Sequence, residues 1–248
     1  MIEIENLSKS FGSNHVLQGI TLSVAKGSSM VIIGGSGSGK SVLLKSILGL
    51  ITPDKGRIML NGEEMSNHRR DAFLARFGML FQGGALFDSL PVWQNIAFRL
   101  LRGPGRTGKA HARKVAIEKL RRVGLPPDVA ERFPAELSGG MQKRVSLARA
   151  IATDPEVIFF DEPTTGLDPI MAGVINDLIR EIVTEMGATA MTITHDMSSL
   201  RAIADDVAML HDGKIRWTGP AAQIDRSGDP YVTQFINGSA HGPIETLR

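Results

Sequence analysis

The stretch that decides the fold is Gly34-Gly35-Ser36-Gly37-Ser38-Gly39-Lys40-Ser41. It follows the apolar run 30–33, which is typical of a β-strand, and precedes apolar residues at helical spacing over 42–48. Glycines allow the backbone to curl so that consecutive N–H groups and the start of a helix point at one anion. The pattern therefore predicts a P-loop, in which Lys40 reaches the β- and γ-phosphates of a nucleotide and Ser41 ligates Mg²⁺. The alternative is a flexible Gly/Ser turn, and chance produces this pattern in roughly one chain of this length in a hundred.

Length and composition limit what the chain can be. Its 248 residues suffice for one large domain, or a core with a subdomain, and leave no room for a second catalytic core. It contains no cysteine, which excludes disulfides and thiolate metal sites. The net charge of +2 is nearly balanced and indicates no class of partner. Because no run approaches about 18 consecutive apolar residues and the first residues lack the pattern of a signal peptide, we expect no membrane span.

Two stretches before the P-loop alternate apolar and polar residues. Residues 2–6 and 19–24 follow this pattern, which predicts antiparallel strands with one covered face. Phe11 lies between them, beside a glycine. It is either a core residue of an edge strand or a platform on which a purine ring stacks.

After the P-loop helix, turns alternate with short strands. We expect strands at 57–60 and 79–81, the second closed by Gln82, and a helical region from about 85 to 153. Within that region, 109–124 has apolar residues at helical spacing and ends at Gly124. A glutamine just past a strand is usually an ordinary loop residue, so the role of Gln82 depends on the rest of the chain.

Basic side chains are concentrated in the helical region. Positions 99 to 122 contain one acidic residue, Glu118, and nine basic residues: Arg99, Arg102, Arg106, Lys109, Arg113, Lys114, Lys119, Arg121 and Arg122. We expect a solvated helix face, because the surface is the default place for Lys and Arg. Contact with anionic lipid head groups or an acidic partner is the alternative.

A second anion-seeking feature follows at Leu137-Ser138-Gly139-Gly140-Met141. Ser138 can cap the helix that begins there, and the two glycines leave the first N–H groups of that helix bare. Such a helix end attracts an anion. Two phosphate-seeking loops in one chain call for a joint explanation.

Candidate catalytic residues follow two later strands. The uninterrupted apolar run 157–160 predicts a buried parallel strand, and it leads into Asp161 and Glu162. A metal-bridging Asp followed by a Glu that polarises water suits nucleotide hydrolysis, and the carboxyl ends of such strands are where α/β sheets place ligands. Asp168 can cap the next helix. A strand over 188–194 then ends at His195, which is either structural or a donor to a γ-phosphate.

The remainder of the chain is expected to contain a closing hairpin over 207–218, turning at Asp212-Gly213. Beyond Gly219 the composition is rich in turn-forming residues. The chain shows no internal repeat and no long linker.

Taken together, these motifs resemble the nucleotide-binding subunit of ABC transporters, from Ile2 to about Gly238. The motifs also follow that family's order: A-loop Phe11, Walker A 34–41, Q-loop Gln82, signature 137–141, Walker B 157–161 with Glu162, D-loop Asp168 and switch His195. A signature followed about twenty residues later by Walker B is highly specific. The resemblance implies an α/β fold, an ABC-type P-loop NTPase with a RecA-like core sheet, an antiparallel β-subdomain and an inserted α-helical subdomain. The implied parts are a core at 1–84 and 154–218, a helical subdomain at 85–153 and a C-terminal extension at 219–248.

Finer features resemble the ATPases of MCE-type lipid transporters, above all the type that maintains outer-membrane lipid asymmetry in Gram-negative bacteria. These features are the stretch 81–90, Met141 in place of the commoner Gln, the run 168–170 and the tail 234–243. Two positions depart from the wider family. Val42 stands where many members have Thr or Ser, so one phosphate-contacting hydroxyl is absent, and Phe11 replaces the commoner Tyr.

The resemblance implies that two copies face each other head to tail, with each ATP between Walker A of one copy and the signature of the other. The implied catalytic residues are Lys40, Glu162, which acts on the attacking water, and His195. The implied Mg²⁺ ligands are Ser41, Gln82 and, through water, Asp161. The implied nucleotide contacts are Phe11, Gly34, Gly35, Ser36, Gly37, Ser38, Gly39, Lys40, Ser41, Val42, Gln82, Ser138, Gly139, Gly140, Met141, Asp161 and Asp168.

The resemblance also implies partners and a location. The partners are transmembrane permease subunits, an MCE-type lipid-binding protein and a small accessory subunit, at the cytoplasmic face of the bacterial inner membrane. No nucleic-acid partner is expected. Alternative functions are an ATPase for another cargo, such as an amino-acid importer, and a soluble ABC ATPase acting on nucleic acid. The second conflicts with the short spacing between Gln82 and Ser138 and with the single core. A regulatory subunit that only binds ATP conflicts with the presence of Glu162 and His195.

Overall fold

The computed structural model describes residues 1–65, 70–103 and 105–245, and the chain divides into two compact units. The first unit joins Met1–Arg70 to Ile193–Arg248, and the second is Asp71–Thr192. The predicted division into core, helical subdomain and extension is a different partition, and it stays a prediction. Among the described residues, no helix has the length and apolar character needed to cross a membrane.

An antiparallel sheet forms the first part of unit 1, with strand order β2-β1-β4-β5. The predicted alternation is confirmed, because Ile2, Ile4 and Leu7 of β1 are buried while their neighbours are more exposed. The strands are longer than predicted, and the turn at Gly12 joins the first two. The bounds are β1 Ile2–Phe11, β2 Asn14–Val24, β4 Lys55–Leu60 and β5 Glu63–Glu64.

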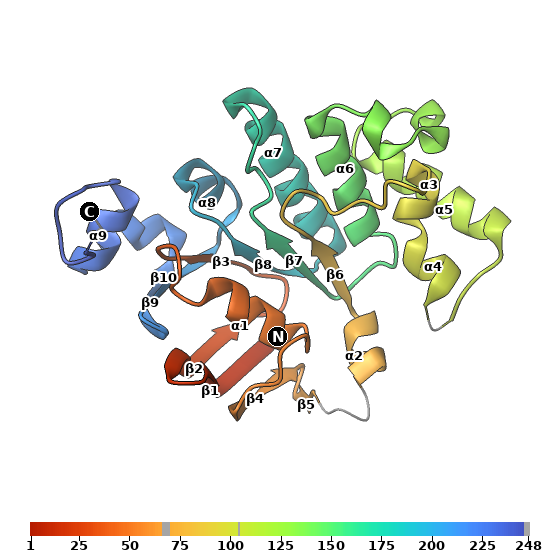
Figure 1. The fold of residues 1–248 in the computed structure, drawn as a ribbon. Helices are drawn as coiled ribbons and strands as arrows, with labels where there is room; N and C mark the ends of the chain where they lie inside the picture. The colour runs from red at the N-terminus through yellow and green to blue at the C-terminus, as the bar shows by residue number, and fades with distance from the viewer. Residues whose placement is uncertain (66–69, 104, 246–248) are drawn as a thin grey trace. The chain divides into compact units, whose positions relative to one another are not determined.

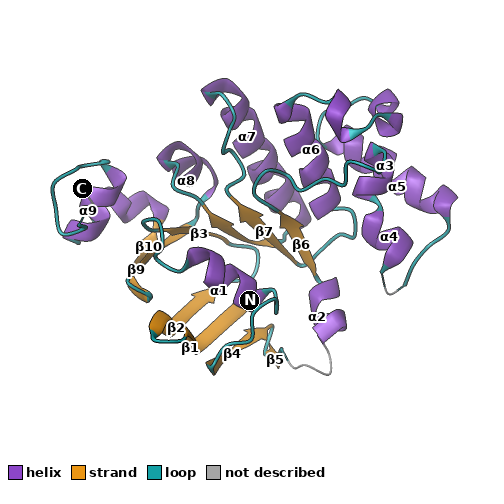
Figure 2. Cartoon of the chain, viewed as in Figure 1, coloured by secondary structure: helices purple, strands orange, loops and turns teal. Residues whose placement is uncertain are grey.

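Unit 1 also contains three neighbouring strands in the order β10-β9-β3. Strand β3 (Ser29–Ile33) is buried along its whole length and pairs in parallel with β9 (Asp206–His211). The predicted hairpin is confirmed, since β9 and β10 (Lys214–Pro220) pair antiparallel around Asp212 and Gly213. Helix α1 (Lys40–Ile47) begins shortly after β3 and lies beside β1 and β2, where it contacts β2 (Figure 2).

The last part of unit 1 is more helical than the sequence suggested. It holds α8 (Met197–Ile203), the 3₁₀ helix η4 (Ala221–Arg226) and α9 (Pro230–Ile236). The turn-rich composition hid α9, although its start follows a recognisable rule. The carboxylate of Asp229 accepts hydrogen bonds from the N–H groups of Tyr231 and Val232, at 2.8 and 3.2 Å, and a proline occupies the first helical position.

In unit 2 the neighbouring strands run in the order β8-β7-β6. Strands β6 (Phe77–Leu80) and β7 (Val157–Asp161) are parallel, as the apolar run predicted. The ring of Phe77 meets Phe159 edge to face, with centroids 5.2 Å apart. Helix α7 (Pro169–Met186) separates β7 from β8 (Thr189–Ile193) in the chain.

The predicted helical region forms a set of helices in unit 2, which gather around α6 in Figure 1. Helix α3 contacts both α5 and α6, and α5 contacts α6. The predicted helix at 109–124 is confirmed within two residues, with Gly124 just beyond its end. Helix α2 (Arg70–Ala75) precedes this region in the chain. The bounds within the region are α3 Val92–Ile96, α4 Phe98–Arg102, α5 Lys109–Arg122, η2 Pro127–Glu131, η3 Pro134–Glu136 and α6 Gly139–Ala150.

Candidate functional site

The loop between β3 and α1 in unit 1 has the form expected of a phosphate cradle. The Nζ of Lys40 donates to the carbonyl oxygens of Gly34 and Gly35, at 2.7 and 2.8 Å, so its ammonium lies against the loop it belongs to. Among the described residues, no side chain caps the start of α1, and a helix N-terminus of this kind favours an anion. The loop therefore combines a cation with a helix N-terminus in one place.

Two glycines of this loop cannot be replaced without moving neighbouring backbone. A Cβ on Gly34 would collide with the carbonyl oxygen of Leu210, and one on Gly39 would come within 2.9 Å of the carbonyl oxygen of Val16. Gly39 also has φ 106°, which L side chains rarely adopt. The glycines at these two positions thus have a packing cause.

Phe11 and His195 also lie in unit 1. Phe11 ends β1 with half of its surface exposed, so the reading of it as a core residue is wrong, while base stacking stays a prediction. The Nζ of Lys9 lies 5.4 Å from the Phe11 ring centroid. His195 is exposed, directly after Thr194, whose N–H contacts the Ile32 carbonyl of β3 at 3.4 Å. The structure therefore brings His195 to the end of the strand that leads into the P-loop.

The residue after His195 fixes the local backbone. The Asp196 carboxylate caps α8, accepting from the N–H groups of Ser198 and Ser199 and from the Ser199 hydroxyl at 2.6 Å. Burial acts to raise the pKa of Asp196, but these hydrogen bonds and the neighbouring His195 outweigh it, and the pKa lies below its ordinary value.

Unit 2 holds the remaining predicted site residues. Gln82 is exposed and follows the end of β6, and Asp161 ends β7. Because Leu80 pairs with Phe160 in these parallel strands, Gln82 and Asp161 lie at the carboxyl ends of neighbouring strands. The other predicted Mg²⁺ ligand, Ser41, lies in unit 1.

Sequence reasoning missed the residues that hold the loop after Gln82. On α6, Arg149 donates to the carbonyls of Gly84 and Ala85 at 2.6 and 2.7 Å, and the Ser146 hydroxyl donates to Gly84 at 3.0 Å. Ala85 is a non-glycine residue at φ 46°, so these contacts stabilise a conformation that the chain alone disfavours. Burial lowers the pKa of Arg149.

A second clamp holds the segment that follows. Asn95, fully buried on α3, accepts from the Phe87 N–H at 2.7 Å and donates to the carbonyls of Phe87 and Leu90 at 3.0 and 2.9 Å. A buried amide that satisfies backbone groups of a loop fixes its path. No sequence pattern marks Asn95 for this role.

The start of α6 confirms the predicted cap. The Ser138 hydroxyl accepts from the Met141 N–H at 3.4 Å, and Ser138 and Gly139 are exposed. Gly140 is buried, and a Cβ there would meet the end of the flexible Met171 side chain at 2.6 Å. The predicted signature residues thus form an accessible helix N-terminus.

The carboxylates at the end of β7 differ in exposure. Asp161 is half-buried, and Glu162 is 9% exposed with its backbone in the left-handed region at φ 49°. The Thr165 hydroxyl donates to the Glu162 carboxylate at 3.1 Å. From α6, the Nζ of Lys143 donates to the Glu162 carbonyl at 3.3 Å. Burial lowers the pKa of Lys143, while the charges of Asp161 and Glu162 act in the opposite direction.

Asp168 caps α7 as predicted. One oxygen of its carboxylate accepts from the N–H groups of Ile170 and Met171, both at 3.0 Å. Asp168 is exposed, and 79% of the Ile170 side chain is exposed next to it. This loop is therefore an accessible surface of unit 2.

The donor atoms suit a nucleotide with its metal better than a resident metal centre. Across the described ranges, no group of three or more His, Asp or Glu side chains could hold a metal ion by itself. The predicted ligands Ser41, Gln82 and Asp161 supply hydroxyl, amide and carboxylate oxygens, which Mg²⁺ accepts together with phosphate oxygens and water. Ser41, Gln82 and Asp161 therefore stay the predicted Mg²⁺ ligands.

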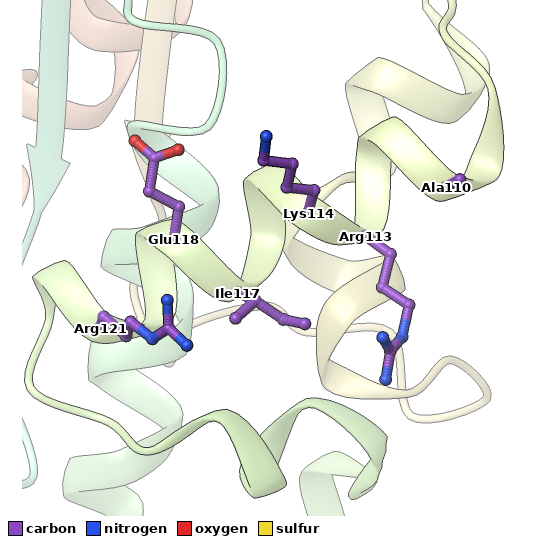
Figure 3. Close-up of a pocket in the computed structure, with 6 residues that line it drawn as sticks. All are labelled: Ala110, Arg113, Lys114, Ile117, Glu118 and Arg121. Carbon is purple, nitrogen blue, oxygen red and sulfur yellow. The ribbon is translucent and has the colours of Figure 1, made fainter.

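The basic segment is only partly the solvated face that we expected. That expectation is wrong for Lys119, which is 4% exposed and paired with Asp154 at 2.6 Å, and for the half-buried Arg99, which donates to the carbonyls of Phe77 and Leu74. The outer side of α5 lines a hollow of about 460 Å³ (Figure 3). The residues that line it are Ala110, Arg113, Lys114, Ile117, Glu118 and Arg121.

Comparison with known proteins extends these observations. A family model described as ABC transporter matches residues 17–165. The "Probable ribonucleotide transport ATP-binding protein mkl" of Mycobacterium leprae is 40% identical over 246 residues, which cover 98% of this chain and 70% of that protein. The "Intermembrane phospholipid transport system ATP-binding protein MlaF" of Haemophilus influenzae is 39% identical over 247 residues, which cover 98% and 93%.

The fold of this chain is also similar to that of a solved structure. It is the dimeric structure of a post-hydrolysis state of the ATP-binding cassette MJ0796 bound to ADP and Pi. The TM-score is 0.80 and the sequence identity 29%, and the match covers 89% of this chain and 99% of that one.

Proposed function

This chain belongs to the ABC transporter family, and on that premise we propose that it powers the transport of phospholipid or a related lipid between membranes through a separate permease. Its fold is that of an ABC-type P-loop NTPase, which confirms the fold class predicted from the sequence. The chain is an ATPase of this family. What it moves, and with which partners, are the proposed parts.

One observation carries the mechanism: the chain has two helix N-termini suited to phosphate, one in each unit. The first is α1 with Lys40 beside it, and the second is α6 with Ser138 as its cap. A head-to-tail dimer gives both a use, because each nucleotide then lies between the P-loop of one copy and Ser138-Gly139-Gly140 of the other. The similar cassette MJ0796 is a dimer with bound ADP and Pi, which supports the proposal of such a dimer for this chain.

The chemistry follows from positioning and charge. Phosphoryl transfer requires little covalent participation, so the cradle and Lys40 bind and orient the phosphates and stabilise the charge that develops on them. Glu162 takes a proton from the attacking water and His195 donates to the γ-phosphate. When bound, Mg²⁺ neutralises phosphate charge, and Ser41, Gln82 and Asp161 are the residues that would hold it.

The lipid cargo rests on the likeness to MlaF. Identity of 39% extends over 98% of this chain and 93% of that protein, so the two match over nearly their whole lengths. We place the chain at the cytoplasmic face of a bacterial inner membrane, bound to permease subunits, an MCE-type lipid-binding protein and a small accessory subunit. A ribonucleotide cargo is the second candidate, because the 40% identical mkl carries that description.

The Glu162→Gln variant tests the catalytic assignment. Without the general base we expect ATP binding to persist and hydrolysis to fall at least about 100-fold. Glu185→Gln is the matched control, since its carboxylate pairs with Arg122 on the surface, and it should hydrolyse ATP at the normal rate. Near-normal turnover by Glu162→Gln removes Glu162 from the role.

Purification from detergent-solubilised membranes tests the cargo. The chain should co-purify with a membrane-spanning permease, and mass spectrometry should find about one phospholipid molecule for each complex. Ribonucleotide that co-purifies only when the permease is present would favour the ribonucleotide cargo instead. Recovery with nucleic acid and without a permease would contradict both.

A further inference from the structure

Lys143 is a buried lysine that the mechanism above does not use. It is the fifth residue of α6 and only 5% of its surface is exposed. Burying an ammonium is unfavourable unless nearby groups compensate. The compensation comes from the end of β7, where the Glu162 carbonyl accepts from Nζ at 3.3 Å and the charges of Asp161 and Glu162 act on the ammonium.

Glu162 needs such a neighbour because its backbone is strained. A non-glycine residue in the left-handed region costs of order 1–3 kcal/mol and persists only where its surroundings hold it. Contacts at both ends hold Glu162. The Nζ of Lys143 and the Thr165 N–H, at 3.3 and 3.4 Å, donate to its main-chain carbonyl, and the Thr165 hydroxyl donates to its carboxylate at 3.1 Å.

Lys143 and Ser138 also belong to one rigid element. They are five positions apart in the sequence, a rise of about 7.5 Å along an α-helix. The same helix therefore presents its N-terminus outward, toward the nucleotide of the proposed partner copy, and a side chain inward, to the main-chain carbonyl of Glu162 in its own copy. A displacement of α6 along its axis would move both.

We propose that Lys143 is a positioning residue. It fixes the position of Glu162 by holding the main-chain carbonyl of Glu162, and it thereby couples the position of Glu162 to that of the N-terminal, signature end of α6. The inference rests on the proposed role of Glu162 in hydrolysis. It goes further by assigning a function to a residue outside the nucleotide-binding motifs. Lys143 itself touches neither nucleotide nor water in this role.

The test is a double-mutant cycle between Lys143→Met and Glu162→Gln, measured as single-turnover hydrolysis of radiolabelled ATP. Misplacing a catalytic group by about 1 Å can cost up to about 100-fold, so we expect Lys143→Met alone to slow hydrolysis about tenfold. In the Glu162→Gln background the same change should cost less than about twofold, because the group that Lys143 positions is already disabled. ATP affinity should stay within about twofold in every variant.

Arg144→Met is the matched control. Arg144 is the next residue of α6, also a long cation, and it donates to a main-chain carbonyl at the same distance of 3.3 Å, but to Gly124 rather than Glu162. It should hydrolyse ATP at the normal rate. If Lys143→Met fails to fold, Lys143→Gln carries the same cycle with a smaller loss of packing.

The outcomes separate the inference from the proposed function. Near-normal turnover by Glu162→Gln alone overturns the role of Glu162, and the inference with it. If Glu162→Gln is slow but Lys143→Met is as fast as the unchanged protein, only the inference is wrong. An equal loss from Lys143→Met in both backgrounds also overturns it, because a merely structural role gives that result.

Discussion

Arg149 offers the most quantitative test of how the loop after Gln82 is held. Replacing it with Met keeps much of the side-chain volume and removes the hydrogen bonds to Gly84 and Ala85, at 2.6 and 2.7 Å. Hydrogen bonds to a charged group contribute about 1.5–3 kcal/mol each. The Gly84 carbonyl keeps the Ser146 hydroxyl at 3.0 Å, so Ala85 bears most of the loss. With some relief from no longer burying a charge, the net loss of unfolding free energy should be about 2–3 kcal/mol.

The assay is thermal and denaturant unfolding of Arg149→Met beside Arg113→Met. Arg113 is the control, because its guanidinium pairs with Glu131 on the surface at 2.7 Å and such pairs contribute about 0–1 kcal/mol. For a chain of this size the expected loss lowers Tm by about 5–10 °C. The Mg²⁺ concentration for half-maximal hydrolysis should rise several-fold in Arg149→Met only, as the Gln82 loop loses its anchor.

Two results would refute this reasoning. Equal stability of the Arg149 and Arg113 variants would show that the loop does not depend on the guanidinium. A destabilised Arg149→Met with an unchanged Mg²⁺ requirement would show that the clamp stabilises the fold without positioning Gln82.

Further predictions concern unit 1. Lys40→Ala should abolish tight ATP binding, and retained micromolar affinity in a calorimetric titration would contradict the P-loop assignment. Asp196→Asn should be less stable than the unchanged chain at neutral pH, because a carboxylate whose pKa is lowered in the folded state stabilises the fold at pH values above its unfolded pKa of 3.8. The difference in stability should vanish as the pH falls through the lower pKa of the folded state. A difference that does not depend on pH would contradict this prediction. Deleting the residues after Gly238 should weaken dimerisation and complex assembly, if the tail packs on the partner ATPase, and unchanged assembly would count against that contact.

Much of the fold could be predicted because local rules and packing agree. The P-loop needs glycine at Gly39, where φ is 106°, and the apolar run before Asp161 is typical of a strand covered on both faces and forms the buried part of β7. Ser138 and Asp168 cap the helices they precede. In each case the local structure is determined by a short stretch of sequence.

The contacts between distant segments could not be predicted in this way. Arg149 and Asn95 act on carbonyls 64 and 8 residues away, and backbone acceptors leave no mark on the sequence. The position of Lys143, in contrast, does leave a mark on the sequence. It lies on the helical line of Gly140, Leu147 and Ala150, all buried, so its spacing places a charge on the covered face of α6.

The C-terminal tail shows the same limit. Its composition predicted only turns, yet the buried Gln234 side chain donates to the carbonyls of Ser239 and Ile244 at 3.2 and 3.1 Å and accepts from the Ile244 N–H at 2.6 Å. One amide therefore folds residues 239–244 back against α9. Whether the tail also meets a second copy is a separate prediction, tested by the deletion above.

The central claim is that ATP joins two copies of this chain, and the most direct measurement is the molar mass of Glu162→Gln protein by light scattering, with and without MgATP. We expect monomers without nucleotide and dimers with it, and monomers again when Ser138→Arg, which places a bulky cation at the exposed start of α6, is added to the slow variant. Protein that stays monomeric with saturating MgATP, even when the permease is supplied, would contradict the account.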